Sequence, residues 1–370
     1  MNRCVPLRGK KATSACRRKD GHLLRPKEGQ PITQAVIESI AAFLPERVVG
    51  NEELARTISR WSAADIFQKT GIRERRFASP GECSSDLAVG AARKLMEEGR
   101  MNPAEIDYVI FCTQSADYAL PASACLIQDR LGLHTTCGAS DVNQGCSGYV
   151  TGLSLSKGLI VSHQARCVLL LTGETYSKYI NPRDAAVATL FGDAGTATVI
   201  RAREETDAGI GEFVFGTDGR GGKNLVVPAG GMRKPRTPQT AQETTDSDGN
   251  TRSENDLYMN GRDVFRFAIS EVPRTYRSLL AKTGLAPEQL DYLILHQANK
   301  YMLDQLVRRL ELPKEKIPYE FEDIGNTVSN TIPIVLERLL KRDTLHPGQQ
   351  LMLIGFGVGY SWAACTVRWA

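Results

Sequence analysis

Short apolar runs alternate along the chain with stretches in which apolar residues recur every three or four positions. Apolar or β-branched runs bounded by turns predict buried strands. They lie at 36–41, 107–113, 139–142, 168–172, 195–201, 291–295, 351–355 and 362–368. Apolar residues at helical spacing predict amphipathic helices. They lie at 51–59, 84–98, 121–131, 147–162, 264–283, 300–310 and 329–341. This alternation is typical of an α/β protein.

The pattern occurs twice. Residues 94–112 and 279–296 each comprise an amphipathic helix, a break containing Gly, a turn begun by Pro and a strand that opens with Asp-Tyr. Residues 191–202 and 356–369 each place a Phe-Gly turn before an apolar strand. The repeat predicts a duplicated α/β unit with halves at 32–204 and 205–370. The polar segment 230–256 predicts a long surface loop without chemistry of its own.

Composition and charge exclude several classes of protein. The 370 residues are 42% hydrophobic and 24% charged, as is usual for a globular protein. Because no apolar run reaches about 18 residues, no membrane span is expected. Residues 1–28 hold nine Lys or Arg against Asp20 and Glu28, so they carry +7 and the remainder about −3. That remainder gives no reason to expect nucleic-acid binding.

The basic N-terminal extension, residues 1–31, lacks the apolar core of a signal peptide. Three interpretations stay open: a disordered extension, an organellar transit peptide, or a start codon placed too far upstream. The nine cysteines include no CxxC pair and are scattered over the chain. Such a pattern predicts reduced thiols and a cytoplasmic protein, with most cysteines acting as small core residues.

One cysteine lies in a different context. The predicted strand 139–142 leads through Gly145-Cys146-Ser147-Gly148 into the predicted helix 147–162. Glycines permit a tight turn and close approach of a ligand, and the N–H groups at a helix start favour a thiolate. The helix dipole contributes only about 0.3–1 kcal/mol, so a nearby His would also be needed. The alternative is a buried structural Cys.

Two further motifs favour a nucleophile. His296 ends an apolar strand, at the carboxyl edge where α/β proteins place their chemistry. Asn326 follows Gly325 just before a predicted helix, although an Asn in a turn is usually only a cap. All three residues lie at strand-to-helix junctions and come from both halves, as expected for a site built between duplicated halves.

This set of side chains suits decarboxylative carbon–carbon bond formation. Cys attacks a thioester to give an acyl-enzyme. Asn exchanges no protons, so it serves as a hydrogen-bond donor. His and Asn together would stabilise the enolate that forms when malonyl loses CO₂, and the carbanion would attack the acyl-Cys. Papain-like proteases also use Cys, His and Asn, but there the Asn orients the His, and the duplicated α/β pattern of this chain does not resemble those proteases.

Other functions are weighed against this one. An acyltransferase of the same fold would pass the Cys-bound acyl group to an alcohol or amine. A catalytically silent dimer partner would typically have lost the Cys. A nucleotide-binding protein would need a strand–GxGxxG–helix unit with an acidic residue after it, which the sequence does not contain.

Seven separated motifs resemble β-ketoacyl-[acyl carrier protein] synthase III and cover residues 32–370. They are TGIRERR, ALPASAC, DVNQGCSGYVTGL, LFGDAGT, HQAN, IGNTVSNTIP and GFGVGYSWAA. The resemblance implies a thiolase-like five-layered αβαβα fold and a homodimer. It also implies a catalytic triad of Cys146, His296 and Asn326, an acyl carrier protein as partner, and acyl-CoA or acyl-carrier thioesters as substrates, with no cofactor and no metal.

The resemblance assigns further roles. The oxyanion donors would be the backbone N–H groups of Cys146 and Val358. Phe356 would lie beside the nucleophile, and Leu120 would reach the acyl pocket of the partner subunit. The contacts to the carrier protein and its pantetheine arm would come from Lys69, Arg262, Gln297, Ala298, Asn299, Lys300 and Tyr301.

Several of these positions depart from the family pattern. Asp65 stands where a Trp usually stacks on the adenine of coenzyme A, and Lys69 replaces an Arg. Tyr301 replaces a second Arg and Arg262 an Asn. Loss of the stacking ring leaves room for an acyl-carrier-protein starter and for a specialised pathway as readily as primary fatty-acid initiation.

Overall fold

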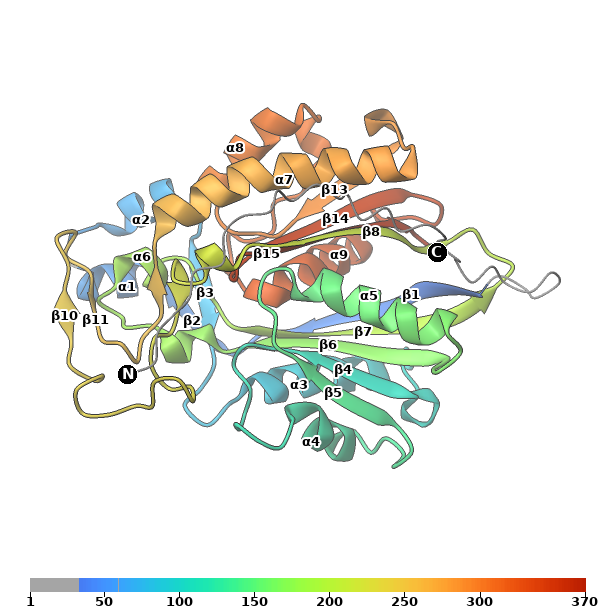
Figure 1. Cartoon of the computed structure of the whole chain (residues 1–370), viewed down its shortest axis with the longest axis horizontal. Helices are drawn as coiled ribbons and strands as arrows, with labels where there is room; N and C mark the ends of the chain where they lie inside the picture. The colour runs from blue at the N-terminus through green and yellow to red at the C-terminus, as the bar shows by residue number, and fades with distance from the viewer. Residues whose placement is uncertain (1–32, 59) are drawn as a thin grey trace, which may run out of the picture. The chain divides into compact units, whose positions relative to one another are not determined.

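Two β-sheets, one from each predicted half, form the framework of the protein (Figure 1). The computed structural model describes residues 33–58 and 60–370, so the predictions for residues 1–31 lie outside the described residues. Sheet 1 has the order β1 (Thr33–Phe43), β7 (Ala194–Glu204), β6 (Cys167–Glu174), β4 (Tyr108–Cys112), β5 (Gly138–Val142). Sheet 2 has the order β13 (Tyr292–Leu295), β14 (Gln350–Gly357), β15 (Ser361–Arg368), β8 (Gly209–Thr217).

The two sheets share one pairing scheme. In sheet 1, β4 pairs in parallel with β6, and β6 is antiparallel to β7, which is antiparallel to β1. In sheet 2, β13 pairs in parallel with β14, and β14 is antiparallel to β15, which is antiparallel to β8. Sheet 1 adds β5, parallel to β4. The sheets therefore repeat one unit, and the chain passes between them in the turn that joins β7 to β8.

Helices form three further layers around and between the sheets (Figure 1). Helices α3 (Ser84–Glu97) and α4 (Ser123–Arg130) cover the outer face of sheet 1. Helices α5 (Gly148–Val161) and α9 (Thr331–Lys341) lie between the sheets. Helices α7 (Gly261–Thr283) and α8 (Lys300–Leu310) cover sheet 2. The expected five-layered αβαβα fold is thus confirmed, and residues 33–370 form one compact unit.

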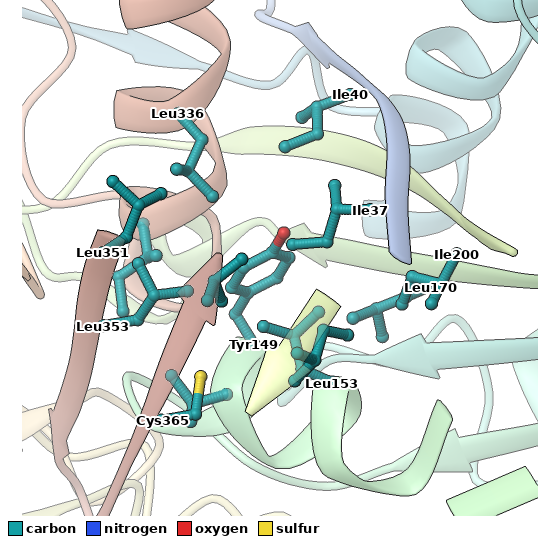
Figure 2. Packing of buried hydrophobic residues seen from close by; sticks show 14 of the residues in the cluster. Ile37, Ile40, Tyr149, Leu153, Leu170, Ile200, Leu336, Leu351, Leu353 and Cys365 are labelled. Atoms are coloured by element: carbon teal, nitrogen blue, oxygen red, sulfur yellow. The ribbon is translucent and has the colours of Figure 1, made fainter. Parts of the chain in front are cut away.

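The central core packs the middle helices against both sheets. Figure 2 shows Tyr149 and Leu153 of α5 among Ile37 of β1, Leu353 of β14 and Leu336 of α9, all of them buried. Burial of each such side chain stabilises the fold by about 1.5–3 kcal/mol. This packing fixes the start of α5, Gly148, which lies two residues after Cys146.

Smaller elements complete the structure. The remaining strands are β2 (Arg47–Gly50), β3 (Glu74–Phe77), β9 (Leu225–Val226), β10 (Thr244–Thr245), β11 (Thr251–Arg252) and β12 (Tyr258–Met259). The remaining α-helices are α1 (Asn51–Thr57), α2 (Ala63–Thr70) and α6 (Ala185–Ala188). The 3₁₀ turns are η1 (Pro103–Glu105), η2 (Tyr176–Tyr179), η3 (Gly219–Gly221), η4 (Pro287–Gln289), η5 (Lys314–Lys316) and η6 (Val328–Asn330).

The segment 230–256 is a loop that contains the short hairpin of β10 and β11. None of the helices within residues 33–58 and 60–370 is long and apolar enough to cross a membrane.

Candidate active site

Cys146 lies in the tight turn between β5 and α5 and is only 5% exposed. The turn closes where the N–H of Gly148 donates to the carbonyl oxygen of Gly145 over 2.7 Å. A Cβ atom at Gly145 would lie 2.5 Å from side-chain atoms of Gln114 and Val358. Glycine is therefore required here by close packing, as the sequence predicts.

The end of β14 presses against this cysteine from the second half. A Cβ atom at Gly357 would lie 2.7 Å from the Cys146 Sγ, and one at Gly355 would lie 2.6 Å from its carbonyl oxygen. The backbone N–H of Val358 donates to the sulfur, and the backbone N–H of Cys146 itself also lies against it. The two N–H groups expected to form the oxyanion hole therefore both lie beside the sulfur.

The thiol is not the thiolate that a helix N-terminus favours. Burial, with a smaller contribution from the nearby Glu174 carboxylate, raises the pKa of Cys146 to about 12, and the two N–H groups oppose this shift. As expected from the sequence, the small contribution of the helix start is not enough to give a thiolate, because burial outweighs it. Cys146 is therefore a thiol at neutral pH.

His296 follows β13 and is 2% exposed. Its ring packs edge-on against Phe356, with ring centroids 5.5 Å apart. Burial lowers the pKa of His296 to about 3, so the imidazole is neutral. The Nδ1 atom lies 2.8 Å from the Oγ1 of Thr331, and this hydroxyl lies 3.1 Å from the carbonyl oxygen of Val328.

The hydroxyl of Thr331 has one proton and two possible acceptors. When it donates to Nδ1, the proton of the imidazole is on Nε2, which then donates into the cavity. When it donates to the Val328 carbonyl, Nδ1–H donates to the hydroxyl and Nε2 has a free lone pair. His296 can therefore present either a free lone pair or an N–H group to the cavity while it is neutral, and it becomes an imidazolium only when it takes up a proton.

Asn326 is fixed through its backbone and its side-chain oxygen. Its N–H donates to the Leu190 carbonyl over 2.8 Å, and its own carbonyl accepts from the N–H of Gly192 over 3.0 Å. Its Oδ1 accepts from the N–H of Val328 over 2.9 Å. Within residues 33–58 and 60–370, no hydrogen bond engages its NH₂ group, which is left to donate into the cavity. Among the described residues, His296 and Asn326 form no hydrogen bond with each other, whereas in papain-like proteases the Asn orients the His.

These three side chains line one cavity of about 330 Å³. The rest of the wall comes from the loop before β7, from β9, β12 and the end of β14, and from the first turns of α7 and α8 with the residues just before α8. Its residues are Leu190, Phe191, Leu225, Met259, Gly261, Arg262, Val264, Phe265, Ala298, Asn299, Tyr301, Met302, Phe356 and Gly357. The wall is mostly apolar with few polar groups, as is usual for a site that binds a small molecule.

Five of the other predicted site residues reach this cavity. Arg262, Ala298, Asn299, Tyr301 and Phe356 all line it. Asn299 caps α8, because its Oδ1 accepts from the N–H of Met302 over 2.9 Å, and its NH₂ group is again the free end. Tyr301 stacks on Phe265 and is 57% exposed, which places it at the entrance.

Gln297 does not reach the cavity, so its assignment as a carrier contact is corrected. Its side chain is buried, donates to the carbonyl of Leu295 over 2.7 Å and accepts from the N–H of Glu320 over 2.9 Å. Its polar atoms are thus fully used within the protein, where they join the end of β13 to the loop before Phe321.

Three further predicted residues lie outside the cavity wall. Lys300 pairs with Asp304, and Lys69 lies over the Trp61 ring at 5.2 Å. Leu120 is 80% exposed on its own chain, so its predicted role in a partner subunit stays a prediction. Asp65, at the position of the missing stacking ring, is engaged in the capping box of α2 with Ser62.

Three residues that contact or lie near the proposed catalytic side chains were not predicted from the sequence. Thr331 and Val328 hold the His296 ring and the Asn326 carboxamide, and Glu174 lies buried near the sulfur. Glu174 has a sequence signal, because an acidic residue at the end of the apolar strand CVLLLTGE is unusual. Thr331 and Val328 have none, since their contacts depend on the folded loop.

Comparison with known proteins gives a consistent result. The profile described as 3-Oxoacyl-[acyl-carrier-protein (ACP)] synthase III matches residues 140–219, and its C-terminal counterpart matches residues 280–369. The β-ketoacyl-[acyl-carrier-protein] synthase III of Caldanaerobacter subterraneus is 33% identical over 339 residues, which is 91% of this chain and 98% of that protein.

Two solved structures are also similar over nearly the whole chain. A crystal structure of a 3-oxoacyl-(acyl-carrier-protein) synthase III at 2.1 Å is 52% identical with a TM-score of 0.89, covering 91% of this chain and 100% of that one. The 3-oxoacyl-(acyl-carrier protein) synthase from Burkholderia xenovorans LB400 is 34% identical with a TM-score of 0.84, covering 92% and 96%.

Proposed function

This chain belongs to the β-ketoacyl-[acyl-carrier-protein] synthase III family, and we propose that Cys146, His296 and Asn326 carry out its reaction. The enzyme joins an acyl starter to malonyl-[acyl carrier protein] by decarboxylative condensation, in fatty acid or specialised lipid biosynthesis. The observation that supports the proposed roles is the shared cavity, which brings a thiol, a neutral imidazole and a carboxamide together. The chemistry needs only side chains and backbone N–H groups, so we propose that no cofactor or metal takes part.

The first step loads the starter. The sulfur of Cys146 attacks the carbonyl carbon of the acyl thioester, and the thiol proton passes to Nε2 of His296. The oxyanion lies between the N–H groups of Cys146 and Val358, which the structure holds beside the sulfur. The C–S bond of the incoming thioester then breaks, and the leaving thiol takes the proton back from His296.

The second step forms the carbon–carbon bond. The thioester oxygen of malonyl accepts hydrogen bonds from Nε2–H of His296 and the NH₂ group of Asn326. The carboxylate leaves as CO₂, and its bonding electrons form an enolate that these two donors stabilise. The carbanion attacks the acyl carbon, and the bond to Cys146 breaks to release a 3-oxoacyl thioester. One such donor changes a rate by about 10²–10³.

The pantetheine arm would enter at the exposed side of the cavity. We propose that Arg262, Ala298, Asn299 and Tyr301 contact it, because they line the cavity on that side. Lys69 and Lys300 are exposed cations outside the cavity wall and would meet the acidic surface of a carrier protein. With no aromatic ring at Asp65, we favour a starter delivered on a carrier protein over one delivered on coenzyme A.

Release of CO₂ tests the proposed function. Purified protein is incubated with an acyl-[acyl carrier protein] and malonyl-[acyl carrier protein] labelled in its free carboxyl group. We expect one CO₂ for each 3-oxoacyl product, with an acyl mass added to the protein when malonyl is left out. An ester or amide product formed without CO₂ would instead identify an acyltransferase that passes the acyl group to an alcohol or amine.

We also propose a homodimer built on strand β5. This strand is at the edge of sheet 1, where β4 is its only neighbour among the described strands, and all five of its residues are partly exposed. An unpaired edge is a ready site for a second copy. Gln114 and Asn143, just after β4 and β5, line a second cavity of about 560 Å³ that Leu225 shares with the first. A second copy paired along β5 would place its exposed Leu120 near this cavity.

Light scattering in solution checks the dimer. We expect a mass of twice the chain mass of 40.6 kDa. A Leu120→Asp variant places a charge in the proposed apolar contact and should shift the protein toward monomer, whereas Met232→Asp, at an exposed position in the segment 230–256, should not. A monomer in the unmodified protein would contradict the proposal.

We further propose that the enzyme works in the cytoplasm. Seven cysteines in the described part of the chain are free thiols, Cys146 among them. Thiols stay reduced in the cytoplasm, and an acyl-accepting cysteine must be reduced to react.

A further inference from the structure

Glu174 is a buried acid next to the nucleophile that the reaction above does not use. It ends β6 and is 0% exposed. Its Oε1 accepts from the Ser329 hydroxyl over 3.0 Å. Its Oε2 accepts from the backbone N–H of Gln114 over 3.1 Å and from the Ser115 hydroxyl over 3.2 Å. One carboxyl group thus joins three segments that are far apart in the sequence.

One of these segments carries the catalytic donors. Ser329 belongs to the loop 326–331, which contains Asn326 and also Thr331, the partner of the His296 ring. The same strand holds this loop at a second point, because the Thr172 hydroxyl donates to the Asn330 Oδ1 over 2.5 Å. The end of β6, in the first half, therefore fixes the loop that positions both donors of the second half.

The carboxyl group also acts on the nucleophile through its charge. Burial, with a smaller contribution from Asp193, raises the pKa of Glu174 to about 8, and its three hydrogen-bond donors oppose this shift. The ionised carboxylate in turn raises the pKa of the thiol of Cys146. The titratable groups that face Glu174 in the described residues are Cys112, Cys146, Tyr176, Tyr179 and Asp193. None of these is a cation, so no positive partner offsets the charge of Glu174.

We propose that Glu174 is a positioning residue, whose hydrogen bond to Ser329 holds the Asn326 loop in the geometry for decarboxylation. The proposal rests on the function given above for Cys146, His296 and Asn326. It assigns control of the decarboxylation step to a side chain that touches neither substrate.

A double-mutant cycle tests the positioning role. Glu174→Ala and Ser329→Ala each remove one end of the same hydrogen bond, so each should lower the decarboxylation rate about 10-fold, while self-acylation stays within about twofold. The double variant should be no slower than either single one, because the bond can be lost only once. Glu174→Gln should restore most of the rate, since its NH₂ group can donate to the Ser329 hydroxyl.

The matched control is Ser156→Ala. This buried serine donates to the Gly152 carbonyl within its own helix α5 and, among the described residues, makes no hydrogen bond to the loop 326–331. It should leave the ratio of decarboxylation to acylation unchanged. Since Glu174→Ala leaves buried donors unpaired, thermal unfolding of every variant is measured too, and Ser329→Ala carries the test if Glu174→Ala fails to fold.

Two outcomes would overturn the proposal: decarboxylation unchanged in Ser329→Ala, or additive losses in the double variant. An unmodified enzyme that releases no CO₂ would instead contradict the proposed function. The two failures are therefore distinguishable in one series of assays.

Discussion

Replacing Cys146 with Ala abolishes acylation of the protein while leaving its fold in place. No other described cysteine lines the cavity, so the acyl group has no acceptor in the variant, and we expect at least a 10³-fold loss, roughly as for other removed nucleophiles. The fold should survive because Ala keeps the Cβ atom, and the small void left by the sulfur costs about 1 kcal/mol. Protein-bound label after incubation with a radiolabelled acyl donor measures the effect, and thermal unfolding checks the fold.

The neighbouring thiol provides the control. Cys112 is also buried, and its sulfur lies 3.1 Å from the Gln144 carbonyl, outside the cavity wall. Cys112→Ala should keep its label, because the nucleophile is untouched. Undiminished label in Cys146→Ala would contradict the assignment of the nucleophile.

Replacing His296 with Ala lowers decarboxylation of malonyl more than it lowers self-acylation. The imidazole is one of two donors to the enolate oxygen, so its loss should cost about 10²–10³ in decarboxylation. In acylation it serves as the base for the Cys146 thiol, and water in the cavity can take over part of that role, so the loss in this step should be smaller. Carbon dioxide release and the rate of mass gain on the protein measure the two steps separately.

Asn326→Ala separates the two roles of His296. A carboxamide cannot exchange protons, so this variant removes a donor and leaves the base intact. It should lose decarboxylation to a similar extent and keep its acylation rate. Equal loss of both steps in His296→Ala would mean that the imidazole chiefly activates the thiol, and the proposed division of roles would be wrong.

Most of the fold could be predicted from the periodicity of apolar residues. Each of the eight predicted strands and seven predicted helices is present, with bounds that differ by a few residues. Strand β8 was not predicted because Gly211, Glu212 and Gly216 interrupt its apolar pattern. Helix α2 was not predicted either, although it is as long as α4, which was.

Cys146, His296 and Asn326 line one cavity, as the sequence predicts, and their catalytic roles stay predictions. Cys146 and His296 each lie between a strand and a helix, which is a local feature. Asn326 was expected at such a junction too, but no described strand precedes it: it follows a loop and makes an isolated bridge to Phe191. The pKa of Cys146 could not be predicted, because the helix start is visible in the sequence and the burial around the sulfur is not. Gln297 was misplaced for the same reason. Its neighbours in the motif face the cavity, but its own orientation is set by Leu295 and Glu320.

The seam between the two duplicated halves has a consequence for truncated forms of the enzyme. The first half alone would keep the thiol and Glu174 but lose the Val358 amide and both enolate donors. The second half alone would keep the donors and have no acyl group to receive a carbanion. Each half of the chain therefore depends on the other for turnover, and neither half alone could act as a catalyst.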